Sequence, residues 1–269
     1  MSAERYAFGQ NWSDYVSRHF SEERVERSRR HMLGFLGLDS LADKTFLDIG
    51  SGSGLHSLAA HRAGAARVVS FDYDHDSVAT TRRLWDGVGR PASWEVSQGS
   101  ILDRSFVDTL PTADIVYSWG VLHHTGDQWT AIRNAASRVP PGGLFYISLY
   151  TSDAFKRPDP SFWLDVKRRY NRAGWLGQRA MEAWYIARFE VGLSPFGVLK
   201  VARRLVNERE SRGMSFYTDV KDWLGGWPME FSSIADVTRF GEKQLGLTLL
   251  RMKDGEATTE YLFQRPADG

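Results

Sequence analysis

The sequence predicts an α/β fold with a mostly parallel seven-stranded sheet, an antiparallel last strand and a mostly helical insertion. A short apolar run at Thr45–Ile49 leads into three alternating glycines and then into helix-compatible residues. Helical patterns separate most of the later strand-like runs, as expected for a parallel sheet. The last two runs flank Asp254-Gly255, which is a hairpin signal. Strand-like runs follow the first at 67–71, 94–97, 113–119, 144–150, 247–253 and 258–264.

The glycine turn after the first strand indicates a nucleotide-like ligand. Gly50, Gly52 and Gly54 have no Cβ, so the backbone there can bend sharply and touch a ligand. Leu55 stands where a dinucleotide fingerprint has its third glycine, and no Gly-Lys-Ser/Thr follows for a P-loop. Asp48 at the strand tip repels phosphate and suits a ligand with a positive amino group or sulfonium. A glycine-rich turn without any ligand is the alternative.

The spacing Asp-x-Gly-x-Gly-x-Gly resembles motif I of the class I methyltransferases that use S-adenosylmethionine (SAM). Further along, Leu122-His-His and Pro140-Pro-Gly-Gly143 resemble the later motifs of this family, closest to its ubiquinone/menaquinone and small-molecule branch. The resemblance covers roughly 40–150 and 232–265 and implies a Rossmann-like fold with SAM as cofactor. It implies that the first strand and turn contact SAM through Asp48, Gly50, Ser51, Gly52 and Gly54.

An acidic residue ends the second strand about 20 residues beyond the turn. There Asp72 can accept hydrogen bonds from both ribose hydroxyls, and the resemblance puts the ribose-binding acid at this place. The resemblance also implies Tyr73 beside the adenine, with Ser100 and Ile101 along its edge. Alternatively, Asp72 caps the following helix, a role for which Asp74 competes.

Residues 1–39 are expected to form an N-terminal helical lid. Ser21-Glu-Glu-Arg predicts a helix start. The lead-in before it resembles a family segment that folds over the cofactor, which makes Asn11 and Trp12 candidate lid residues. A core anchor is the alternative for Trp12.

Two histidines follow the fourth strand, at the carboxyl end of the sheet where ligands bind. Methyl transfer to a hydroxyl needs a proton removed, and histidine titrates in the right range. We expect His124 to be the base and His123 its neighbour or a packing residue, with Trp119 at the cofactor. Tyr217 and Asp219 are the alternative catalytic groups. No metal is predicted, although His123, His124 and Asp127 have the residue types of a metal site.

Residues 151–231 form an insertion between 40–150 and 232–269, which together make the SAM-binding domain. The insertion holds five of the ten Trp residues, and its 14 Lys/Arg exceed its 10 Asp/Glu. Helices are expected at 162–170, 176–191 and 198–208. A cap over the acceptor is the favoured role. A surface that contacts membrane or a lipidic acceptor, a homodimer contact and an RNA contact are the alternatives.

The segment 212–230 of the insertion has the composition of a binding site. Polar groups lie among glycines and aromatic residues, and Arg212, Tyr217 and Trp223 are the candidate substrate contacts. A structural turn capped by Asp222 is the alternative.

Composition restricts the function classes. The chain has 269 residues, a formal net charge of +1 and no cysteine. The lack of cysteine excludes disulfides and Cys-ligated zinc. The near-neutral charge gives no reason to expect DNA binding and disfavours RNA binding. Neither a signal peptide nor 18 consecutive apolar residues is seen, so a cytoplasmic protein is expected.

The sequence therefore predicts a SAM-dependent methyltransferase that acts on a small-molecule or lipid-like acceptor, at an oxygen. An RNA methyltransferase and a non-catalytic SAM-fold binding protein are the alternatives.

Overall fold

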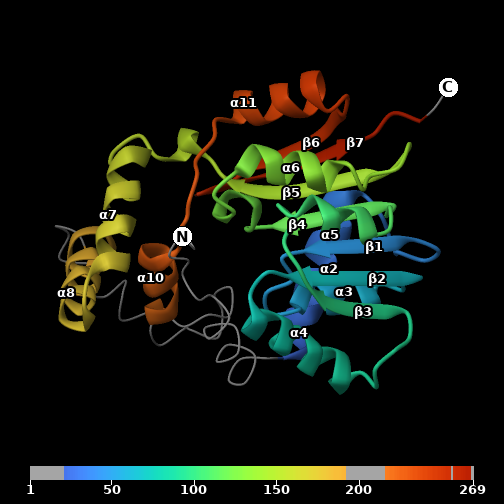
Figure 1. Cartoon of the computed structure of the whole chain (residues 1–269), viewed down its shortest axis with the longest axis horizontal. Helices are drawn as coiled ribbons and strands as arrows, with labels where there is room; N and C mark the ends of the chain where they lie inside the picture. The colour runs from blue at the N-terminus through green and yellow to red at the C-terminus, as the bar shows by residue number, and fades with distance from the viewer. Residues whose placement is uncertain (1–20, 192–215, 256, 268–269) are drawn as a thin grey trace.

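A computed structural model describes residues 21–191, 216–255 and 257–267. Its centre is one seven-stranded sheet in the order β3-β2-β1-β4-β5-β7-β6 (Figure 1). Strand β7 runs antiparallel to both of its neighbours, and the other neighbouring strands run parallel. The strands are β1 Thr45–Ile49, β2 Arg67–Asp72, β3 Trp94–Gln98, β4 Ile115–Trp119, β5 Leu144–Tyr150, β6 Thr248–Asp254 and β7 Thr258–Gln264. The predicted fold class is confirmed.

Helices cover both faces of the sheet. One face packs against α2 (Glu22–Leu36), α3 (Leu55–Arg62) and α4 (His75–Gly87). The other packs against α5 (Arg104–Thr109), α6 (Gln128–Ala136), α11 (Ile234–Arg239) and the π-helical turn η4 (Phe240–Gln244). Ser21 caps α2 as predicted, by accepting a hydrogen bond from the amide of Arg24. The sequence reading missed α5, a helix of only six residues.

Side-chain alternation along the strands decides which face each residue joins. In β5, Phe145, Ile147 and Leu149 enter the core under α6 and α11. Tyr146, between them, enters the core under α2 and α3. Strand β1 lies between β2 and β4. On one side of β1 the sheet continues through β2 to β3, and on the other side it continues through β4 to β5, so the strand order reverses at β1. Ligands of parallel α/β sheets bind at the carboxyl ends of the strands at this switch point.

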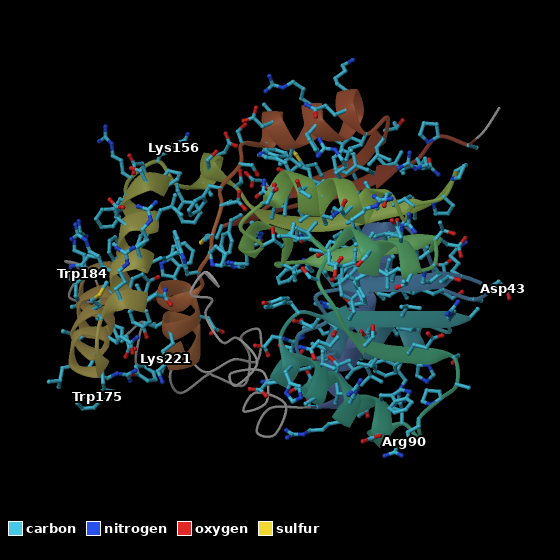
Figure 2. The ribbon with its side chains drawn as sticks, in the orientation of Figure 1. Asp43, Arg90, Lys156, Trp175, Trp184 and Lys221 are labelled. Atoms are coloured by element: carbon cyan, nitrogen blue, oxygen red, sulfur yellow. The ribbon has the colours of Figure 1, made fainter. Side chains whose placement is uncertain are left out.

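The insertion forms a second helical body. It contains α7 (Pro160–Arg172), α8 (Trp175–Tyr185), the π-helical turn η3 (Ile186–Val191) and α10 (Phe216–Gly225). These helices stand at one end of the sheet (Figure 1). Asp43, just before β1, lies at the opposite end from Trp175 and Trp184 (Figure 2). The insertion therefore faces the carboxyl ends of the parallel strands.

Helix α10 shows that the alternative reading of segment 212–230, a structural turn, is wrong for Phe216–Gly225. Its Val220 and Leu224 are buried against Trp163, Val166 and Tyr170 of α7. Packing of this apolar stripe offsets the weak helix propensity of a segment rich in aromatic residues and glycine. The helix predicted at 198–208 lies outside the described residues. Among the helices described, none is long and apolar enough to cross a membrane.

Candidate functional site

The glycine turn requires glycine at its alternating positions. Gly50, Gly52 and Gly54 have φ angles of 76°, 53° and 78°, in the left-handed region. A Cβ on Gly50 would lie 2.4 Å from a methyl carbon of Val121, in the loop after β4. A Cβ on Gly54 would lie 2.9 Å from the Cα of Thr81 on α4. The turn is therefore pressed between the loop after β4 and α4.

The carboxylate of Asp72 connects the glycine turn with the start of α4. Its Oδ2 accepts a hydrogen bond from the Gly52 amide, and its Oδ1 accepts one from the Asp74 amide, both at 2.9 Å. The N-cap of α4 is Asp74, which accepts from the Ser77 amide, so the capping alternative for Asp72 is wrong. Burial raises the pKa of Asp72, these backbone hydrogen bonds oppose the rise, and the pKa is about 6. The carboxylate is thus ionised near neutral pH, beside the turn.

An open pocket of about 380 Å³ lies at the carboxyl ends of β2 and β3. It adjoins Asp72, the last residue of β2. Two of the predicted adenine contacts, Tyr73 and Ser100, line it, but Ile101 is buried in the sheet core and is absent from the lining. The lining residues are Tyr73, Asp74, His75, Gln98, Gly99 and Ser100.

Asp48 ends a buried chain of hydrogen bonds that the sequence reading did not foresee. The Trp94 indole donates to the Ser70 hydroxyl at 2.9 Å, and Ser70 donates to Ser57 at 2.7 Å. The Ser57 hydroxyl donates to Asp48 Oδ2 at 2.5 Å. Burial raises the pKa of Asp48 to about 7, against the effect of the Ser57 hydrogen bond. This carboxyl group fixes α3 to β1 and β2. Its predicted contact with SAM stays a prediction.

Ser51 also has a structural partner. Its buried hydroxyl lies 2.9 Å from the Thr81 hydroxyl, which holds the turn against α4.

The two histidines after β4 have different surroundings. The His124 Nδ1 lies 2.7 Å from the carbonyl oxygen of Pro228, in the segment that returns from the insertion. Because a carbonyl only accepts, we assign the Nδ1 proton to this bond, which leaves the basic lone pair on Nε2. His123 is fully buried. Burial, then the charges of His124 and Lys167, hold the pKa of His123 well below its ordinary value. This environment suits packing for His123 and proton transfer for His124.

An aromatic wall stands beside these histidines. We use this name for Tyr150, Phe155, Trp223 and Phe231. Tyr150 lies 4.6 Å from His123, 6.0 Å from His124 and 5.6 Å from Trp223, measured between ring centroids. The rings of Phe155 and Trp223 stack at 5.5 Å. The wall joins the end of β5 to α10.

The return segment of the insertion is bonded to the loop after β4. The Glu230 amide donates to the His123 carbonyl at 2.9 Å. Its carboxylate accepts a hydrogen bond from the Gln128 amide, also at 2.9 Å, at the start of α6. With the His124–Pro228 contact, these bonds fix the position of the insertion over the carboxyl end of the sheet.

Three predicted residues of the insertion, Trp223, Tyr217 and Asp219, lie on α10. Trp223 joins the aromatic wall. The Tyr217 hydroxyl donates to Glu182 and accepts from Arg179, so this phenol links α10 to α8. Asp219 lies on α10, and Asn11, Trp12 and Arg212 lie outside the described residues. Within the described part of the chain, no three His, Asp or Glu side chains are grouped to hold a metal ion.

Comparison with known proteins shows the family. Residues 18–198 match a family described as a methyltransferase domain. A ubiquinone biosynthesis O-methyltransferase from a Methylobacterium strain is 29% identical over 148 residues, which are 55% of this chain and 55% of that protein. The chain spans about half the length of the curated relatives it matches.

Solved structures share the fold at low sequence identity. An O-methyltransferase family protein from Burkholderia thailandensis has a TM-score of 0.57 and 15% identity, covering 97% of this chain and 60% of that one. The magnesium protoporphyrin IX methyltransferase from Synechocystis, solved with bound SAH, has a TM-score of 0.54 and 13% identity, covering 95% and 93%. The chain belongs to the methyltransferase domain family of class I SAM-dependent methyltransferases.

SAM is the cofactor of this family, and the site has suitable chemistry for it. The left-handed glycines turn the backbone sharply at the end of β1, and the Gly52 amide holds the Asp72 carboxylate beside this turn. Asp72 is an ionised acceptor beside the turn, and the open pocket lies next to it. An indole N–H at the end of β4, that of Trp119, is buried without a hydrogen-bond partner among the described residues. The turn, Asp72 and the pocket can hold a sugar and a base, whereas the predicted contact of Trp119 with the cofactor stays a prediction.

Proposed function

We propose that this protein transfers the methyl group of SAM to an oxygen atom of a small-molecule or lipid-like acceptor. The observation that carries this proposal is the His124 imidazole. It is oriented by the Pro228 carbonyl and lies next to the aromatic wall, at the carboxyl end of the sheet. A candidate base, a surface for an apolar acceptor and a glycine turn of the nucleotide-binding type therefore lie at the same end of the sheet.

The reaction that this site would support is an in-line displacement. SAM supplies a methyl group on a sulfonium that loses its charge as it reacts. The chain must align the acceptor oxygen with that methyl group and exclude water. The aromatic wall provides a dry surface for the body of the acceptor. His124 Nε2 is the atom that takes the proton from the acceptor hydroxyl, because Nδ1 is held by Pro228.

The insertion is proposed to be the acceptor cap, and residues 1–39 the N-terminal lid, although α2 within this segment packs against one face of the sheet. The bonds from Glu230 to the loop after β4 support the cap, because they fix it over the site. The curated relatives are named ubiquinone biosynthesis O-methyltransferases, which supports an acceptor with a ring and an oxygen nucleophile. Trp175 and Leu176 on α8 are exposed, at 69% and 74%, and support peripheral contact with a membrane or lipid, or with a second copy of the chain. Cytoplasmic location is part of the proposal.

Labelled methyl transfer tests the proposal. The protein is incubated with methyl-labelled SAM and a panel of phenols and aliphatic alcohols, with bulk tRNA as a separate acceptor. We expect label on a hydroxyl compound, and a loss of about 100-fold or more in rate for His124→Gln. His61→Gln, a histidine of α3, is the matched control and should keep the wild-type rate. Wild-type transfer by His124→Gln would refute the assignment of the base, and labelling of tRNA alone would refute the acceptor class.

A further inference from the structure

Three polar side chains form a row across the sheet that the family match does not explain. Trp119 of β4 pairs with Ser148 of β5, and Ser148 pairs with Glu260 of β7. Directly paired residues point to the same face of a sheet, with their Cβ atoms about 5 Å apart. The row lies on the face covered by α2 and α3, because Tyr146, two residues before Ser148, packs there.

Two members of the row have unused hydrogen-bonding capacity. In the described part of the chain, the Trp119 Nε1 and Ser148 Oγ atoms are buried and have no hydrogen-bond partner. Ser148 is 0% exposed. Burying an unpaired polar group is unfavourable, and such groups are accounted for by a bound ligand, by ordered water or by a functional role.

The third member supplies negative charge. Oε2 of Glu260 accepts a hydrogen bond from the Tyr146 hydroxyl and lies 2.9 Å from His31 Nε2 on α2. Burial raises the pKa of Glu260, but the bonds from His31 and Tyr146 outweigh burial, and the net pKa is below the ordinary value. The carboxylate is therefore ionised and held in place at neutral pH. A histidine beside the row, His56, is neutral, because burial lowers its pKa to about 4.

The chemistry of the row selects the kind of group that binds it. An indole N–H only donates, a carboxylate only accepts, and a hydroxyl does both. An anionic group is repelled by Glu260, and an ammonium cannot accept from Trp119. An uncharged group that both donates and accepts matches the row, and a hydroxyl substituent of an acceptor is such a group, as is a water molecule.

The row is next to the aromatic wall. Tyr150, a member of that wall, follows Ser148 by two residues in β5 and so lies on the same face. Its ring lies 6.0 Å from that of His124. If the ring of an acceptor packs against the aromatic wall, a substituent on that ring can reach the row.

We propose that Trp119, Ser148 and Glu260 form an anchoring subsite for a hydroxyl substituent of the acceptor. This inference rests on the proposed function and deepens it by naming the acceptor class as hydroxylated aromatic compounds. The row positions the acceptor and does not remove its proton, because the Glu260 carboxylate already holds two partners.

Nuclear magnetic resonance of the indole N–H groups tests the subsite. The full chain, saturated with S-adenosylhomocysteine, is titrated with phenol and with anisole, which lacks the O–H. Trp119→Phe identifies the Trp119 resonance. Phenol is expected to shift this resonance, and anisole to bind about tenfold more weakly or not at all. Ser148→Ala and Glu260→Gln should each weaken phenol binding about tenfold while the other indole resonances stay in place.

The outcomes separate this subsite from the proposed function. Equal shifts with phenol and anisole, or no shift with either, would overturn the subsite and assign the unpaired atoms to ordered water. Unchanged phenol affinity in both Ser148→Ala and Glu260→Gln would overturn it as well. Calorimetry with SAM on the same samples is independent of the row. If the wild type does not bind SAM, the proposed function is contradicted. If it binds SAM but phenol does not shift the Trp119 resonance, only the subsite is contradicted.

Discussion

Replacing Asp48 by Asn is expected to change how the stability of the protein depends on pH. The Asp48 carboxyl group is 2% exposed and ends the hydrogen-bond chain from Trp94. Its pKa is about 7 in the folded protein, against an ordinary value of 3.8. Asn has the same shape and can still accept from Ser57, but it cannot ionise. The substitution therefore isolates the charge.

The sign and size follow from linkage. An acid whose folded pKa is raised favours the folded state when protonated, so its contribution is complete below pH 3.8 and is lost as pH rises through about 7. A difference of about 3 pKa units, at 1.36 kcal/mol each, gives a total loss on the order of 4 kcal/mol. We expect the wild type to lose this stability with rising pH, whereas Asp48→Asn loses none of it.

Urea unfolding followed by tryptophan fluorescence measures the effect, without SAM, at steps between pH 5 and pH 8. The free energy of unfolding of the variant minus that of the wild type should increase across this range. Asp39→Asn, at an exposed aspartate outside the site, is the control and should follow the wild type. Parallel pH profiles for Asp48→Asn and the wild type would refute the reasoning, because they would mean that the buried carboxyl carries no penalty for ionisation.

Three further outcomes are expected. Gly50→Ala should lower the free energy of unfolding by about 2 kcal/mol, because the new Cβ meets a left-handed φ and the side chain of Val121. Adding Val121→Ala should restore part of this loss, as measured by urea unfolding. Burial lowers the pKa of Lys167 to about 7, so the unfolded state binds more protons than the folded state above pH 7 and the free energy of unfolding rises with pH there. Lys167→Met should flatten this rise between pH 7 and 9, and an unchanged slope would contradict the reasoning. Glu230→Gln should cost about 1 kcal/mol by weakening the bond to the Gln128 amide at the start of α6, and stability equal to the wild type would show that this bond contributes nothing.

Much of the sheet could be predicted because its signals are local. The strands β1, β5 and β7 begin and end where the apolar runs do, and Asp254-Gly255 marks the hairpin. The glycine turn was visible because its alternating positions need a left-handed backbone, which the structure has. These features depend on residues close together in the chain.

The parts that sequence reasoning missed depend on contacts between distant residues. The bond between His124 and Pro228 joins positions 104 residues apart, and the Trp94–Ser70–Ser57–Asp48 chain joins two strands and a helix. The row of Trp119, Ser148 and Glu260 exists only through strand register. Polar residues at strand positions that face the core under α2 and α3 are the signal that could have indicated it.

The central claim is that the glycine turn and the carboxylate of Asp72 at the end of β2 bind SAM. Isothermal calorimetry of SAM with the wild type and Asp72→Ala tests it most directly. We predict one SAM per chain for the wild type, and at least about tenfold weaker binding for Asp72→Ala, which removes an ionised acceptor beside the turn. Asp76→Ala, at an exposed aspartate on α4, should bind like the wild type. No heat of SAM binding to the wild type, or equal affinity in Asp72→Ala, would contradict the account.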